Sequence, residues 1–265
     1  MVETEEFVEM TDGFSLFVRH WTPTCDAEKA ILCIHGFGGH SGGFRIFGES
    51  LATWGVDVYA LDLRGFGNSK EIDLPRGDTK DVKKHLQDLY EAITICRSRH
   101  CRKFYVLGHS LGALYTLWIG ANYPESSDGL ILAAPAVEVK PRISEETRNK
   151  FRTLFASAPE TMIGTRAVAP PDPLRTTQFS VRYLLGLSSA LMGENIFRNA
   201  AKLKKPTLIV HGEADIEAAP SGSKRLFEAI TFEDKTLRLL PGVDHFLWGS
   251  KEQVCSAIMD WLSTH

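Results

Sequence analysis

The chain lacks the motifs that mark metal, nucleotide and nucleic-acid proteins. Its five cysteines are scattered and include no Cys-x-x-Cys pair, so neither a zinc site nor a redox motif is indicated. It has no His-Glu-x-x-His and no Gly-x-x-x-x-Gly-Lys-Ser/Thr segment, and Gly36-Phe37-Gly38 lacks the third glycine of the dinucleotide fingerprint. The net charge is −3, without a dense run of lysine or arginine. We therefore expect no metal, no cofactor and no nucleic-acid partner.

Long apolar segments are also scarce. Residues 1–6 are acidic and contain no apolar core of a signal peptide, which favours a cytoplasmic location. Residues 104–124 contain no Asp, Glu, Lys or Arg and are long enough to cross a bilayer. Their hydrophobic period changes in the middle, however, so a buried strand followed by a buried helix explains them better.

The rest of the chain alternates short apolar runs with amphipathic stretches. This pattern is typical of a mostly parallel sheet with helices on both faces, and 265 residues can form one large α/β domain. Thr11-Asp12-Gly13 is a hairpin signal, so the sheet should begin with an antiparallel pair. We predict eight strands, over residues 5–10, 15–21, 30–34, 56–61, 104–107, 130–133, 207–210 and 236–240. We predict helices over about 44–54, 79–99, 111–122, 221–230 and 251–262.

The alternation stops between residues 136 and 203. This segment contains the loop Pro170-Pro171-Asp172-Pro173 and a helical stretch over residues 178–199, so we predict a helical cap inserted into a core of residues 1–135 and 204–265. The apolar face of the stretch could line an acyl pocket or meet a lipid surface, and packing onto the core explains it equally well. Trp248, beyond the last predicted strand, could border the pocket, and packing in the core explains it equally well. The candidate pocket residues are Leu184, Leu185, Leu191 and Trp248.

The most informative motif is Gly108-His109-Ser110-Leu111-Gly112. It lies between an apolar strand and an apolar helix, as a nucleophile elbow requires. The flanking glycines allow a tight turn that exposes the Ser110 hydroxyl at a helix N-terminus. The context predicts a nucleophilic serine.

A serine nucleophile needs a base and an acid that orients the base. Asp215 follows the predicted strand 207–210, and His245 follows the strand 236–240, so both lie at the carboxyl edge where α/β sheets bind ligands. We predict a triad of Ser110, Asp215 and His245. Glu213, Glu217 and Asp244 are the competing acids, and we expect Asp244 to cap a turn instead.

Acyl transfer also needs donors for the developing oxyanion. The backbone N–H of Leu111 follows the nucleophile, and a second donor should come from the glycine-rich loop of residues 35–39. We assign it to the N–H of Phe37. His35 is expected to anchor this loop, and Asp62 and Arg64 are expected to hold the loop after the strand 56–61.

With these residues in place, the chain resembles the α/β-hydrolases of the monoacylglycerol lipase and lysophospholipase branch, also described as serine aminopeptidase-like hydrolases. The resemblance rests on the loop of residues 35–41, the segments 62–69 and 234–237, Ser110, Asp215 and His245. It implies an α/β-hydrolase fold and a cofactor-independent serine hydrolase acting on a small-molecule ester.

The favoured substrates are medium-to-long acyl esters of the monoacylglycerol or lysophospholipid type. Two alternatives stay open: a broad carboxylesterase or feruloyl-like aryl esterase without lipid preference, and a small-molecule receptor on a hydrolase scaffold. A monomer or weak homo-oligomer is expected, with transient contact between the cap and lipid surfaces.

Overall fold

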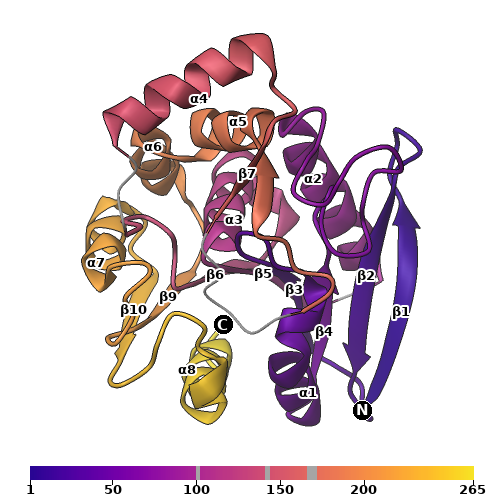
Figure 1. Ribbon diagram of the computed structural model, residues 1–265. Helices are drawn as coiled ribbons and strands as arrows, with labels where there is room; N and C mark the ends of the chain where they lie inside the picture. Colours follow the sequence, from indigo (N-terminus) through magenta and orange to yellow (C-terminus); the bar gives the residue numbers. More distant parts are fainter. Residues whose placement is uncertain (100–101, 141–143, 166–171) are drawn as a thin grey trace.

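A single eight-stranded sheet runs through the molecule (Figure 1). The computed structural model describes residues 1–99, 102–140, 144–165 and 172–265. Of Trp248, within the last range, it describes the backbone but not the side chain. Within these residues the sheet has the order β1-β2-β4-β3-β5-β6-β9-β10. Its strands are β1 (Val2–Glu9), β2 (Ser15–Thr22), β3 (Lys29–Ile34), β4 (Val56–Leu61), β5 (Lys103–His109), β6 (Gly129–Ala133), β9 (Thr207–Gly212) and β10 (Lys235–Leu240).

The sheet is mostly parallel, as predicted. The hairpin β1–β2 is antiparallel and β2 joins β4 antiparallel, whereas every later pairing is parallel. The carboxyl ends of β3, β5, β6, β9 and β10 therefore meet at one edge, and the loops that follow them are brought together.

Helices cover both faces of the sheet because its strands are apolar on both sides. In β3, Leu32 and Ile34 face one hydrophobic core, whereas Ile31 and Cys33 face the other. The first core includes side chains of α2 (Lys83–Ser98), α3 (Leu111–Asn122) and α7 (Pro220–Ala229). The second includes side chains of α1 (Arg45–Thr53) and α8 (Lys251–Leu262), which lie side by side in Figure 1.

The apolar segment 104–124 contains most of β5 and the whole of α3. No helix in the described part of the chain combines the length and the hydropathy needed to span a bilayer.

The segment between β6 and β9 is less uniformly helical than predicted. It contains α4 (Glu145–Ser157), a hairpin of β7 (Met162–Gly164) and β8 (Gln178–Ser180), α5 (Val181–Leu191) and α6 (Glu194–Lys202). The prediction of one helical stretch over 178–199 is wrong at two places. Ser180, the last residue of β8, is the N-cap of α5, and Gly193 has a φ of 67°, which ends helical geometry before α6. Residues 170 and 171 of the predicted proline loop lie outside the described residues.

Polar bonds join this segment to the loop after β4. The Arg182 guanidinium donates to both carboxylate oxygens of Asp78, at 2.7 and 2.5 Å, and the Asp78 side chain is 2% exposed. The backbone N–H of Ser180 also donates to the carbonyl of Gly77. A bidentate pair to a buried carboxylate restricts the position of α5 over the sheet edge.

Candidate active site

Ser110 occupies the turn between β5 and α3 in a backbone conformation that L-residues rarely adopt. Its φ is 56° and its ψ is −115°. A Cβ atom on Gly108 would lie 2.1 Å from the carbonyl oxygen of Gly112, and one on Gly112 would lie 2.0 Å from the carbonyl oxygen of Ile34. Only glycine allows the strand, the turn and the helix to approach so closely, which explains both glycines of the motif.

The structure brings the three predicted triad side chains together. His245 Nε2 lies 3.0 Å from Ser110 Oγ, and His245 Nδ1 lies 2.6 Å from Asp215 Oδ2. A carboxylate can only accept, so Nδ1 carries the proton and donates to Asp215. Nε2 is then free to accept the hydroxyl proton of Ser110. Asp244 accepts the backbone N–H groups of Phe246 and Leu247, which is the turn-capping role predicted for it.

Asp215 is held as a carboxylate by hydrogen bonds on both of its oxygens. Oδ1 accepts the backbone N–H groups of Glu217 and Ala218, each at 2.8 Å, and Oδ2 also lies 3.0 Å from His211 Nε2. Burial by itself raises the pKa of Asp215, but the bonds from His211, His245 and the Ala218 amide outweigh it and hold this pKa well below its usual range.

Two further histidines support the site, and the sequence analysis assigned a role to neither. His211 is the penultimate residue of β9, and its Nδ1 accepts from Ser223 Oγ at 2.6 Å. His109 Nε2 donates to the backbone carbonyl of His245 at 2.8 Å, and burial lowers the pKa of His109 to about 3, so the ring is neutral. His211 precedes Asp215 by four residues and His109 precedes Ser110 directly, but neither spacing indicates these contacts.

The loop of residues 35–39 passes directly beside the nucleophile. A Cβ atom on Gly36 would lie 3.0 Å from Ser110 Cβ. His35 anchors this loop as predicted, because its Nδ1 donates to the Gly36 carbonyl and its Nε2 accepts the Leu63 N–H at 3.0 Å. Burial lowers the pKa of His35 to about 4, which keeps the ring neutral.

The two predicted oxyanion donors have no competing acceptor among the described residues. Neither the N–H of Phe37 nor that of Leu111 donates to another group in the described part of the chain. Leu111 is the first residue of α3, where a helix leaves its N–H groups unpaired. The Phe37 ring is 40% exposed and stacks on Phe179 of β8, with ring centroids 3.8 Å apart.

Asp62 and Arg64 hold the neighbouring loop, as expected. Asp62 accepts the backbone N–H groups of Ser41 at 2.5 Å and Asn68 at 2.7 Å. Arg64 donates to Asp88 and Asp12, and neither acid lines the cavity that contains Ser110.

A cavity of about 170 Å³ opens in front of Ser110. Its lining includes Phe37, His40, Ser110, Val139, Arg175, Glu217, His245 and Phe246. None of the three predicted pocket leucines is among the described residues that line it. Leu191 is buried in the core, Leu184 packs against that core, and Leu185 is partly buried. The side chain of Trp248 lies outside the described residues. No group of three or more possible metal ligands occurs among the described side chains.

Taken with the sheet order, the turn at Ser110 and the aligned side chains define an α/β-hydrolase. A family model described as "Serine aminopeptidase, S33" matches residues 26–252. Because it covers most of the sequence, the chain belongs to this family of hydrolases.

Relatives and solved structures agree with this assignment. A monoacylglycerol lipase of Mycolicibacterium smegmatis is 27% identical over 96% of this chain and 94% of its own length. The human monoglyceride lipase is 25% identical over 93% of this chain and 85% of its own length. The structure of the Paleococcus ferrophilus monoacylglycerol lipase superposes with a TM-score of 0.78 at 25% identity, covering 94% of this chain and 99% of that one.

Proposed function

We propose that this protein hydrolyses carboxylic esters through an acyl-enzyme, with monoacylglycerols and related medium-to-long monoacyl esters as its substrates. The observation that carries the proposal is the line from Ser110 Oγ through His245 to Asp215, with separations of 3.0 and 2.6 Å. The names of the similar lipases support the substrate class.

In the first step His245 Nε2 accepts the proton of Ser110, and Oγ bonds to the ester carbonyl carbon. Collapse of the tetrahedral adduct breaks the bond to the alcohol, which leaves with the proton from His245. Water, deprotonated by His245, then attacks the acyl carbon of the acyl-enzyme. Collapse of this second adduct breaks the bond to Ser110 Oγ, which takes the proton back from His245, and releases the carboxylic acid. Asp215 keeps the imidazole in the required tautomer and stabilises the imidazolium.

The backbone N–H groups of Phe37 and Leu111 are assigned to the oxyanion of both tetrahedral adducts. Neither N–H has another acceptor within residues 1–99, 102–140, 144–165 and 172–265, which supports this assignment, because preorganised donors need not break existing bonds during the reaction. The location of Leu111 at the start of α3 adds the positive end of the helix dipole.

Residues 136–203 are assigned as the cap and residues 1–135 and 204–265 as the core. In support, Thr176 donates its backbone N–H to Gly38 at 3.0 Å, which brings the segment against the loop of residues 35–39. A cytoplasmic location, a monomeric or weakly oligomeric state and transient contact of the cap with lipid surfaces stay predictions from the sequence.

The test compares wild type with S110A on p-nitrophenyl esters of increasing acyl length. We expect S110A to lose kcat by at least about 10,000-fold, and S263A, which changes an exposed serine near the C-terminus, to match wild type. Retained turnover in S110A would overturn the assignment of the nucleophile.

The length profile tests the substrate class. A maximum at octanoyl or longer esters supports the monoacylglycerol type, whereas a preference for short or aryl esters identifies a broad carboxylesterase. Micromolar ligand binding without turnover of any ester identifies a receptor.

A further inference from the structure

Arg175 places a cation in the cavity of the nucleophile. It lines this cavity together with Ser110 and His245, although it belongs to the segment between β7 and β8. The backbone N–H of Thr176 donates to Gly38 at 3.0 Å, which fixes the adjacent residue beside the predicted oxyanion loop.

The guanidinium of Arg175 forms no hydrogen bond or salt bridge in the described part of the chain, although its positive charge contributes to the lowered pKa of Asp172. Its Nε is buried and makes no hydrogen bond. The acid nearest in sequence, Asp172, is already used, since Oδ2 accepts from His40 at 2.9 Å and Oδ1 accepts the Leu174 N–H at 2.8 Å. Glu217 lines the same cavity, and none of the described salt bridges joins it to Arg175. Buried donors are normally satisfied, so an unpaired one beside a nucleophile needs an explanation.

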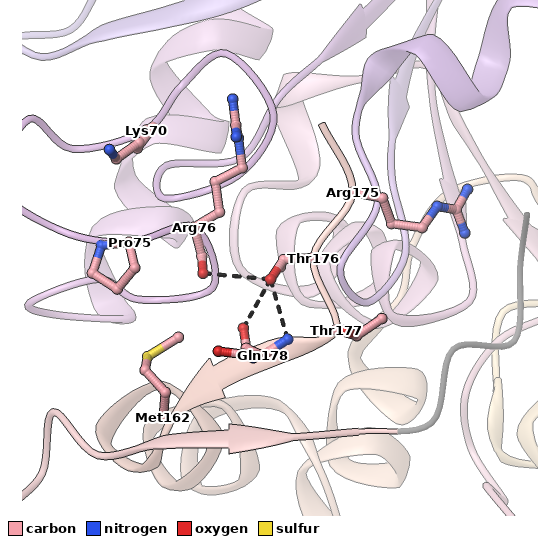
Figure 2. Close-up of a pocket in the computed structure, with 8 residues that line it drawn as sticks. All are labelled: Lys70, Pro75, Arg76, Met162, Arg175, Thr176, Thr177 and Gln178. Carbon is pink, nitrogen blue, oxygen red and sulfur yellow. Dashed lines mark hydrogen bonds between the residues drawn. The ribbon is translucent and has the colours of Figure 1, made fainter. Parts of the chain in front are cut away.

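Other arginines of the same region are committed to the fold. Arg182 is paired with Asp78, and the Arg76 Nε–H donates to the Gly67 carbonyl at 2.7 Å. Arg76 borders a second cavity of about 310 Å³ that also touches Arg175. Figure 2 shows the Arg175 guanidinium pointing away from Lys70 and Arg76, so its charge is directed out of that second cavity.

The charge of Arg175 is also felt at groups next to the nucleophile. Burial is the main cause that lowers the pKa of His109 and of His35, and the positive charge of Arg175 lowers both further. His109 precedes Ser110 and His35 begins the loop beside it, so this effect agrees with the place of Arg175 in the lining of the same cavity.

We propose that Arg175 binds an anionic group of the substrate, a carboxylate or a phosphate, and so selects monoacyl esters that carry such a group. This inference rests on the proposed ester hydrolysis at Ser110. A guanidinium presents a planar set of N–H donors that matches two oxygens of a carboxylate or phosphate. Glu217, on the same cavity, repels such a group and directs it toward Arg175.

Two pairs of esters test the proposal on either side of the scissile bond. On the acyl side, p-nitrophenyl hexanoate is compared with the p-nitrophenyl monoester of adipic acid, which differs by a terminal carboxylate. On the alcohol side, 1-octanoylglycerol is compared with its 3-phosphate. The readout is the ratio of kcat/KM for the anionic ester to that for the neutral one.

In R175Q this ratio should fall by about 10- to 100-fold for at least one pair, since a charge-assisted hydrogen bond is lost. R175K keeps the charge without the planar fork and should give an intermediate ratio. E217Q removes the repelling carboxylate and should raise the ratio. R152Q removes an exposed cation of α4, outside the cavity lining, and should leave the ratio at the wild-type value.

The outcomes separate this inference from the proposed function. If wild type hydrolyses neither ester of either pair, the proposed function fails. If it hydrolyses the neutral esters while the ratio is unchanged in R175Q and E217Q, only the role of Arg175 is wrong. An equal loss on neutral and anionic esters in R175Q would identify a purely structural role and also overturn the proposal. Should R175Q fail to fold, R175K and E217Q still decide.

Discussion

The strained turn at Ser110 predicts that S110G is more stable than S110A, although both variants are inactive. Ser110 has a φ of 56° and a ψ of −115°, a combination that suits glycine and is unfavourable for a residue with a Cβ atom. Both S110G and S110A lose the hydroxyl that lies 3.0 Å from His245. Their difference in free energy of unfolding therefore isolates the backbone strain.

The magnitude follows from two opposing effects. Backbone strain of this kind costs about 1 to 3 kcal/mol, and the ψ of Ser110 lies far from the left-handed helical region, which places it in the upper part of that range. The greater conformational freedom of glycine in the unfolded chain reduces the stability gained from relief of this strain by about 0.5 to 1 kcal/mol. S110G should therefore exceed S110A in stability by about 1 to 2 kcal/mol, which raises Tm by roughly 2 to 5 °C for a chain of this length.

The assay is urea unfolding followed by circular dichroism, with thermal melts as a second measure. A121G, within α3, is the control, because glycine inside a helix costs about 1 kcal/mol and this variant should be less stable than wild type. If S110G is no more stable than S110A, the turn stores no strain, and the reasoning from its dihedral angles is refuted.

Three further predictions concern Gly112 and Asp215. G112A should destabilise the fold by about 3 kcal/mol or more in urea unfolding, because its Cβ would lie 2.0 Å from the Ile34 carbonyl oxygen. G164A is the control, because no atom lies within 4 Å of a Cβ placed there. An equal loss of stability in both variants would contradict the steric argument. D215N should lower kcat about 10,000-fold through loss of the correct imidazole tautomer. Because the pKa of Asp215 is depressed on folding, its carboxylate stabilises the fold above its unfolded pKa of about 3.9, and this contribution is lost as pH falls through the folded value. The stability gap between wild type and D215N should thus be largest near neutral pH and shrink below about pH 4, and a gap independent of pH would count against this.

Much of the fold could be predicted because the signals are local. Strand β4 and helices α3 and α8 have the predicted bounds, and the other predicted elements of the core differ by a few residues at their ends. The segment 136–203 is harder to predict, because the turn at Gly193 and the strand that ends at Ser180 interrupt an apolar pattern that continues through them. The break between α5 and α6 depends on a single glycine, Gly193, and leaves the hydrophobic period of the sequence unchanged.

By itself, the sequence determined the alternation of strands and helices, the turn around Ser110, and the places of Asp215 and His245 after late strands. These features depend on residues that are near neighbours in the chain. Only the tertiary structure decided that His211 supports Asp215, that Leu191 packs in the core, and that Arg175 lines the cavity of Ser110 with an Nε that no described residue accepts from. Such contacts join residues from different loops, and the paths of those loops follow from packing of the whole sheet edge.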